Sequence, residues 1–223
     1  MKKSILLFTL SICVITACSQ ATIFSDNFES GTFDQWTIGG RQMGRESIAE
    51  IVNRNSSQTA HLYQDGFSEI HISKTFNYQN ELNFSFDMEV QSYSEASGSD
   101  SAWYAGAGVS FNFLDNLSNE LGAVTYGSPT STWPIEQNEL LPNRHSVPVS
   151  GALGSYSLDV ESILSYITID LNALTHVQMR FFVHTSSNDY NMSGHTWVDN
   201  VVVTPEPCTL LLLGTGGLLI RKR

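Results

Sequence analysis

Three acidic residues near the two ends of the central part of the chain have the chemistry of a calcium site. Asp26 and Glu29 lie near its start, and Asp199 lies near its end. Ca²⁺ takes about six to eight oxygen ligands from carboxylates, carbonyls and water. If the first and last strands of the domain are neighbours, these carboxylates meet, and we expect structural Ca²⁺ there. The alternative is that Asp26 begins a strand and Asp199 faces solvent or caps a turn.

The sequence holds no recognisable catalytic motif. It lacks the nucleophile elbow Gly-x-Ser-x-Gly, the metalloprotease pattern His-Glu-x-x-His, a phosphate loop and a dinucleotide fingerprint. Asp87 and Glu89 lie on one side of a predicted strand and could serve a hydrolase, but such a pair is more often the solvent-facing side of a strand. The six histidines are scattered, and we expect surface or hydrogen-bonded strand positions for them. No catalytic residue is therefore predicted.

Some aromatic side chains could stack on sugar rings. The candidates, in irregular segments or on the polar side of a strand, are Trp133, Tyr104, Tyr126 and Tyr156. A loop tryptophan such as Trp133 could instead cover an edge of the core. Those that occur in apolar registers, and that we expect in the core, are Trp36, Trp103 and Trp197.

The elements that position these residues are predicted to be strands almost throughout. Apolar and polar residues alternate with period two over residues 81–91, 103–113, 177–183 and 197–203, with shorter runs at 47–52, 59–63, 70–76 and 121–126. Clusters of Ser, Gly, Asn and Asp separate them. The residues predicted to face the core are Phe84, Phe86, Met88, Val109, Phe111, Phe113, Met179, Phe181 and Val183.

This pattern predicts an all-β fold, an antiparallel sandwich of two sheets that spans residues 22–204 as one domain. One short helix is expected near residues 158–167, where an apolar face could be formed by Leu158, Ile163, Leu164 and Ile167. Residues 166–171 fit a strand equally well. A domain of this length is large enough to bury a hydrophobic core.

Charge and cysteine content narrow the function classes. Five of the 11 Lys and Arg lie at the extreme ends of the chain, so residues 22–207 hold six of them against 22 Asp and Glu, a net charge of 6 − 22 = −16. This net negative charge argues against nucleic acid and anionic lipid as partners, and it permits binding of Ca²⁺. The three cysteines, Cys13, Cys18 and Cys208, all lie near the ends, so the central domain has no disulfide.

The first 21 residues are predicted to be a signal peptide. Lys2 and Lys3 form a basic start, residues 5–16 are apolar, and the small residues Ser19 and Ala21 mark a cleavage site for signal peptidase. The apolar core is too short for a stable membrane anchor. A second interpretation is lipoprotein processing at Cys18.

The last residues, 205–223, have three parts in a defined order. Pro205, Glu206 and Pro207 precede an uncharged run at residues 208–220, and Arg221, Lys222 and Arg223 end the chain. This arrangement resembles the PEP-CTERM sorting signal of Gram-negative bacteria. The resemblance implies a short apolar helix that is held transiently in the inner membrane, recognition of the Pro-Glu-Pro segment by an exosortase, and removal of the tail. The run is short for a full membrane span.

A weaker resemblance concerns the domain itself. Residues 26–31 with Trp36, and residues 197–201, are similar to the opening and closing strands of jelly-roll carbohydrate-binding modules. The resemblance implies a fold rather than a ligand. Two functions stay open: a non-catalytic protein of the cell surface or extracellular matrix that binds polysaccharide, or a secreted glycoside hydrolase or lyase on the same scaffold.

Overall fold

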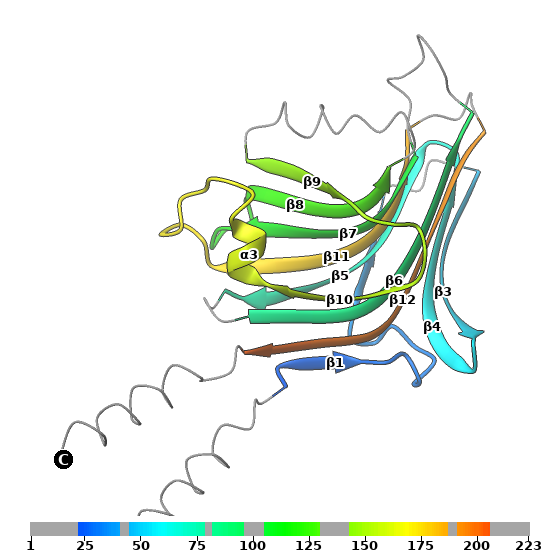
Figure 1. The fold of residues 1–223 in the computed structure, drawn as a ribbon, viewed down its shortest axis with the longest axis horizontal. Helices are drawn as coiled ribbons and strands as arrows, with labels where there is room; N and C mark the ends of the chain where they lie inside the picture. The colour runs from blue at the N-terminus through cyan, green and yellow to red at the C-terminus, as the bar shows by residue number, and fades with distance from the viewer. Residues whose placement is uncertain are drawn as a thin grey trace, which may run out of the picture.

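The computed structural model describes residues 22–40, 45–78, 82–95, 105–129, 143–186 and 191–205. These residues form a sandwich of two six-stranded sheets (Figure 1). The predicted two-sheet, all-β fold is therefore confirmed. The predicted signal peptide and the predicted tail from residue 206 onward, with its apolar helix, lie outside the described residues.

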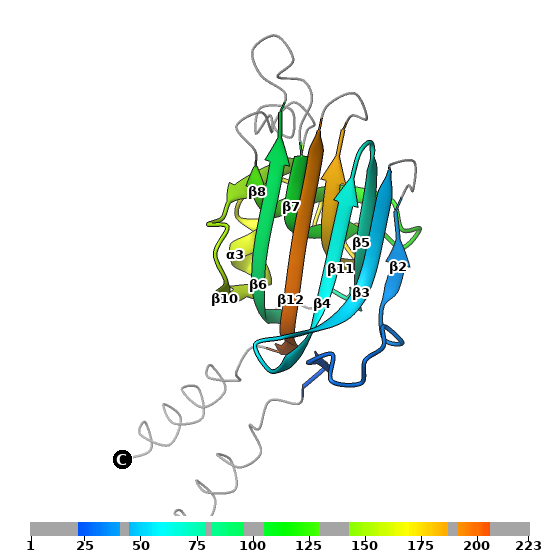
Figure 2. The same ribbon diagram turned by 90° about the vertical axis from the view of Figure 1, so that its right-hand side faces the viewer.

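The first sheet, here sheet A, is antiparallel throughout. Its strands in spatial order are β10 (Gly154–Asp159), β6 (Leu82–Ser94), β12 (Met192–Pro205), β4 (Ser57–Asp65) and β3 (Glu46–Arg54), and β1 (Phe24–Asp26) pairs with the end of β12. Figure 2 shows β6, β12, β4 and β3 side by side across its outer face. The last strand of the domain thus lies in the middle of this sheet, beside the first.

The second sheet, sheet B, is mixed. Its order is β2 (Thr37–Gly39), β5 (Ser68–Asn77), β11 (His176–Thr185), β7 (Ala105–Leu114), β8 (Glu120–Pro129) and β9 (Arg144–Pro148). All its pairs are antiparallel except β8 with β9, which is parallel. This one parallel pair departs from the predicted antiparallel pairing; parallel neighbours need a connection longer than a hairpin turn, and 14 residues separate β8 from β9.

The core fills the space between the two sheets. Alternate residues of each long strand point into it, as the pleat of a strand requires. The nine predicted core residues are all buried, with exposed fractions of 0–2%. Trp36 is buried as well, at 7%, and its ring meets Phe24 edge-on at 5.4 Å. The strand-face predictions for residues 81–91, 103–113 and 177–183 are thereby confirmed for their described residues.

The described part of the chain contains one helix, α3 (Val160–Leu164). Asp159 caps its start and accepts a hydrogen bond from the Ser162 backbone N–H at 2.7 Å. Ile163 is buried as predicted, but Leu158 belongs to β10, so the helix is shorter than expected. Residues 166–171 are irregular, with turns at both ends, rather than the alternative strand. None of the described helical residues makes a segment long and apolar enough to span a membrane.

Both sheets bend along their strands, and sheet B lies on the inside of the bend (Figure 1). Its outer face is therefore concave, while the outer face of sheet A is convex. The two faces carry different sets of polar side chains.

Candidate functional site

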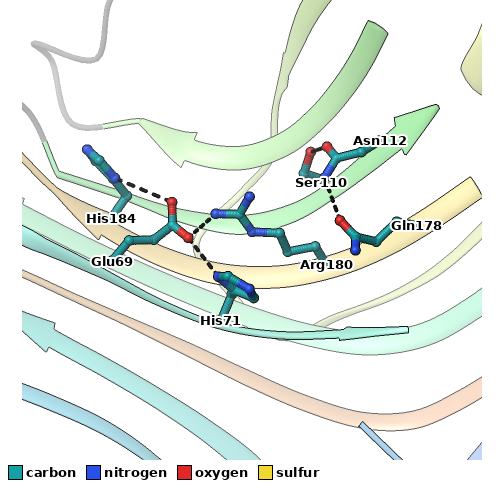
Figure 3. A network of polar contacts seen from close by, with 7 residues as sticks. All are labelled: Glu69, His71, Ser110, Asn112, Gln178, Arg180 and His184. Carbon is teal, nitrogen blue, oxygen red and sulfur yellow. Dashed lines mark hydrogen bonds and ion pairs between the residues drawn. The ribbon is translucent and has the colours of Figure 1, made fainter. Parts of the chain in front are cut away.

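The concave face of sheet B carries a network of polar side chains. It is built from the outward-facing residues of three adjacent strands, whose inward-facing neighbours form the core. The members, shown in Figure 3, are Glu69 and His71 from β5, Ser110 and Asn112 from β7, and Gln178, Arg180 and His184 from β11. The strand register places Arg180 opposite Ser110, and His184 opposite Glu69.

Glu69 is the centre of one half of this network. Its carboxylate accepts a hydrogen bond from Arg180 and lies 2.7 Å from His71 Nδ1 and 3.8 Å from His184 Nδ1. Burial by itself would raise the pKa of Glu69. The contacts with His184 and His71 and the charge of Arg180 outweigh that effect and hold the pKa well below its ordinary value. Glu69 is therefore a carboxylate at any pH near neutral.

The other half of the network is uncharged. The Ser110 hydroxyl donates to Asn112 Oδ1 at 2.6 Å, and Asn112 Nδ2 donates to Gln178 Oε1 at 3.0 Å. Ser110 and Asn112 are themselves buried, so these bonds fix their orientations. The amide nitrogen of Gln178 has no hydrogen-bond partner among the described residues. It remains a donor for a ligand or for water.

An open pocket of about 210 Å³ lies over this face. Asn112, Arg180 and Glu69 line it on one side, and the pair Glu120 and Arg144, from β8 and β9, lines it on the other. Arg144 donates to Glu120 Oε1 from Nη2 at 2.7 Å and from Nε at 2.8 Å. Each guanidinium in the pocket thus faces a carboxylate, and the two ion pairs leave it formally neutral.

The close approach of β7 and β8 depends on glycine. Gly108 faces the concave side of β7, opposite Phe182 and Gly127. A Cβ added at Gly108 would lie 2.2 Å from the Tyr126 carbonyl oxygen, far inside any real contact. The strand can therefore only carry glycine here, and this part of the concave face has no protruding side chain.

The arrangement suits hydrogen bonding better than proton transfer. It presents carboxylates, guanidiniums and amides whose orientations are held by one another, which reduces the entropy lost when a polar ligand binds. A general acid needs a pKa close to the working pH, and that of Glu69 is shifted away from it. In addition, the Nε of Arg180 is buried without a hydrogen-bond partner in the described structure, a cost that a purely structural ion pair would not need to carry.

The structure corrects one predicted ligand contact. Tyr126 points into the core opposite Val109, with an exposed fraction of 6%, and meets Phe111 edge-on at 6.1 Å. Burial, aided by Tyr166 and Asp159, raises the pKa of Tyr126 to about 12. Its ring is therefore not available for a sugar. Of the other three candidates, Tyr156 is partly buried against the core and stacks on Phe86 at 5.3 Å, and Tyr104 and Trp133 lie outside the described residues.

The predicted calcium set does not assemble. Asp26 is buried, and its carboxylate accepts hydrogen bonds from the Phe28 backbone N–H and from Trp36 Nε1, each at 2.8 Å. Glu29 and Asp199 do approach each other, since both lie within hydrogen-bonding distance of the Ser57 hydroxyl, at 3.1 Å and 2.8 Å. The described residues include no group of three metal-ligating side chains. The first and last strands do pair, as the calcium prediction assumed. The carboxylate of Asp26, however, is occupied by its hydrogen bonds with Phe28 and Trp36.

Trp197 is a further correction. It faces outward from β12 and is only partly buried, whereas Val198, Val201 and Val203 face inward. A β-bulge between Asp199 and Val202 shifts the alternation by one residue, so the apolar register of the valines does not extend back to Trp197. Trp103 lies outside the described residues.

The acidic pair on β6 occupies the outer face of sheet A, as the solvent-facing interpretation predicts. Glu89 pairs with Arg54 at 2.9 Å, and Asp87 accepts hydrogen bonds from the side chains of Ser155 and Asn200. These carboxylates do not face the concave pocket. The sorting motif is described only at Pro205, which ends β12 opposite Leu82, so this strand runs one residue into the predicted signal.

Sequence reasoning missed most of the concave network. The signal was present in the strand over residues 176–185, where Gln178, Arg180 and His184 alternate with core residues. Glu69 and His71 share a strand side, which is visible from their spacing. The sequence does not show that three strands, β5, β11 and β7, are adjacent, because strand order depends on pairing between segments far apart in the chain.

The chain is similar to several solved structures. No protein-family model and no curated protein sequence matches the chain. A family 11 carbohydrate-binding module from Clostridium thermocellum, solved with a β-1,3-1,4-mixed-linked tetrasaccharide, is 14% identical, with a TM-score of 0.46; the match covers 84% of this chain and 96% of that one. TmCBM61, solved with β-1,4-galactotriose, is 11% identical, with a TM-score of 0.41, and the match covers 81% and 94%. These similar solved structures are carbohydrate-binding modules.

Proposed function

We propose that this protein binds a polysaccharide on the concave face of sheet B and does not cleave it. The observation that carries the proposal is the open pocket in which Glu69–Arg180 and Glu120–Arg144 face each other across β7. Polysaccharides offer many hydroxyl groups, each able to donate and accept. The pocket offers carboxylate acceptors and guanidinium donors, and Gln178, bonded to the pocket residue Asn112, adds an amide donor on the same face, so this face complements such a ligand.

The ionisation of Glu69 supports binding over hydrolysis. Glycoside hydrolysis requires one carboxylic acid that gives its proton to the leaving oxygen, beside a second carboxylate. Glu69 is held in its charged form by His184, His71 and Arg180, and Glu120 is paired with Arg144. Neither pocket carboxylate is placed as a proton donor, so the enzyme alternative has no supporting acid among the described residues of this face.

The test is a binding screen of the purified protein against a panel of soluble polysaccharides, followed by calorimetry on the best ligand. Arg144→Ala and Gln178→Ala should each weaken binding about tenfold or more, because a hydrogen bond to a charged or buried group is worth about 1–3 kcal/mol. Asn53→Ala, at an exposed position of β3 on the other sheet, is the matched control and should bind like wild type. Equal affinity of all three variants, or release of reducing sugar, would overturn the proposal.

We further propose that the protein is exported and sorted to the cell surface or extracellular matrix. The proposal rests on the sequence of the two ends: the signal-peptide pattern over residues 1–21, and Pro205, Glu206 and Pro207 followed by an apolar run and Arg221, Lys222 and Arg223. Signal peptidase and an exosortase would be the processing partners. Mass spectrometry of surface-associated protein should detect no peptide from residues 210–223. Recovery of an intact C-terminus there would refute the sorting proposal without affecting the binding proposal.

A further inference from the structure

Two histidines meet on the convex outer face of sheet A, on the opposite side of the sandwich from the pocket. His61 lies on β4 and His195 on β12, which are paired strands. His61 Nε2 and His195 Nδ1 are 3.0 Å apart, and the two ring planes differ by only 8°. Nearly coplanar imidazoles at this distance share a hydrogen bond.

The carboxylate of Glu50 determines which nitrogen donates. Glu50 Oε1 lies 3.0 Å from the other ring nitrogen of His61, Nδ1. An ionised carboxylate can only accept, so His61 Nδ1 carries the proton and, in the neutral ring, Nε2 is the acceptor. His195 Nδ1 must then be the donor. The hydrogen bonds therefore form a chain from Glu50 through His61 to His195. The remaining lone pair of this chain is on His195 Nε2, which has no hydrogen-bond partner among the described residues.

Neighbouring side chains from four strands enclose this pair. The Trp197 ring is stacked against both imidazoles, with centroids 5.1 Å from His61 and 4.9 Å from His195. Arg54, from β3, lies over the Trp197 ring at 4.3 Å and pairs with Glu89, from β6. On β4, Tyr63 contacts His195 at 4.7 Å, and burial, followed by the charges of Asp65 and Glu46, raises the pKa of Tyr63. The Trp197 ring thus contacts Arg54 and both imidazoles, while part of it stays exposed.

We propose that Glu50, His61 and His195 form a proton-responsive switch on the outer face of sheet A. One added proton, placed on His195 Nε2, leaves the hydrogen bond from His195 Nδ1 to His61 Nε2 intact. A second added proton puts an N–H on both facing nitrogens, so the bond cannot form and two cations repel each other at 3.0 Å. The contact between β4 and β12 side chains then opens beneath Trp197.

The second protonation also reverses the local charge. With both imidazoles neutral, the carboxylates of Glu50 and Glu89 and the guanidinium of Arg54 give this cluster a charge of −1; with both protonated it becomes +1. Burial, and then the charge of His61, lower the pKa of His195. Neutral His195 therefore stabilises the fold above its unfolded-state pKa of about 6.5. That contribution is lost as the pH falls through the lower folded-state value.

The switch can be tested by nitrogen-detected NMR of the full-length chain labelled with ¹⁵N in its histidines. At about pH 8, both rings should show the Nδ1–H tautomer. On acidification, the pair should take up its two protons at midpoints that differ by more than about one pH unit, the behaviour of coupled groups. A single shared midpoint, or an Nε2–H tautomer of His195, would overturn the proposal.

Variants separate the switch from general effects of mutation. His61→Gln should leave a single titration step, because the site of the second proton is gone. Glu50→Gln, at a side chain that is 49% exposed and so compatible with folding, should lower the first midpoint. His176→Gln on β11, where His176 contacts Thr175 instead, is the control and should change neither step. A His195 curve that is the same in all three variants and in wild type would refute the coupling.

Discussion

Trp36 Nε1 donates a hydrogen bond to Asp26 Oδ2 at 2.8 Å, inside the core beside the first strand. The other oxygen of Asp26 accepts from the backbone N–H of Phe28, which has the positive φ of 57°. One buried carboxylate thus fixes both an unusual backbone turn and the orientation of a core tryptophan. This contact replaces the role in calcium binding that the sequence suggested for Asp26.

Replacing Asp26 should destabilise the domain. Asp26→Ala leaves the indole N–H and the Phe28 backbone N–H without their acceptor, and each buried unsatisfied donor costs about 1–3 kcal/mol. We expect a loss of about 2–4 kcal/mol in the free energy of unfolding, measured by urea denaturation. Asp34→Ala, at an exposed position of the same segment, should change the midpoint little. A variant of Asp26 as stable as wild type would mean that the buried contact contributes nothing.

Phe86 should be one of the most costly core positions to truncate. It is 2% exposed, stacks on Tyr156 at 5.3 Å and meets Phe181 edge-on at 5.2 Å, so it joins β10, β6 and β11. Phe86→Ala should lower the free energy of unfolding by about 3–5 kcal/mol. Thermal denaturation followed by circular dichroism would measure this. Tyr93→Ala, at a 50% exposed site of the same strand, serves as the control, and comparable losses at both positions would contradict the assigned strand faces.

The stability contributed by Glu69 should depend on pH in a defined direction. Its folded-state pKa is lowered, so the ionised form stabilises the fold above the unfolded-state value of about 4.3, and this stabilisation is lost as the pH falls through the folded-state value. Glu69→Gln should therefore cost most near neutral pH, about 1–3 kcal/mol. The difference from wild type should shrink below about pH 4. Denaturation curves at several pH values test this; a difference that grows on acidification would have the wrong sign.

The matched control for that experiment is Glu120→Gln. Its ion pair with Arg144 is more exposed, with side-chain fractions of 32% and 39%. Such pairs contribute about 0–1 kcal/mol, so this variant should show a smaller and flatter difference from wild type.

Gly108 should tolerate no side chain. Gly108→Ala would place a Cβ 2.2 Å from the Tyr126 carbonyl oxygen, and because the obstacle is backbone, β8 would have to move away from β7. We expect a loss of about 1–3 kcal/mol or more, together with weaker ligand binding on the concave face. Gly154→Ala on β10 meets only ordinary contacts from 3.5 Å outward and should be mild. Hydrogen exchange of β8 amides would show whether the disturbance is local.

Period-two alternation was enough to predict the two-sheet fold and nine buried core residues. In a half-buried strand, alternate side chains face the core and the solvent, so apolar and polar residues alternate in the sequence. It failed where the alternation changes phase. The bulge after Asp199 changes which residues of β12 face the core, so Trp197 faces outward. Around Tyr126, the sequence does not indicate which side of β8 packs against the core. The polar network on the concave face could not be predicted from the sequence for another reason. Glu69 meets Arg180 only because β5 and β11 are neighbours, and strand order depends on packing between segments far apart in the chain.

The position of β12 has a mechanical consequence for any attachment through the C-terminal end. β12 ends at Pro205 and is hydrogen-bonded to β6 along one side and to β4 and β1 along the other. A pulling force applied beyond Pro205 would act along this strand and load its ladders in shear, so that many hydrogen bonds would have to break together. An edge strand under the same load would be held by one ladder instead of two. Because β12 is hydrogen-bonded on both sides, the sandwich should resist a force applied at its C-terminal end.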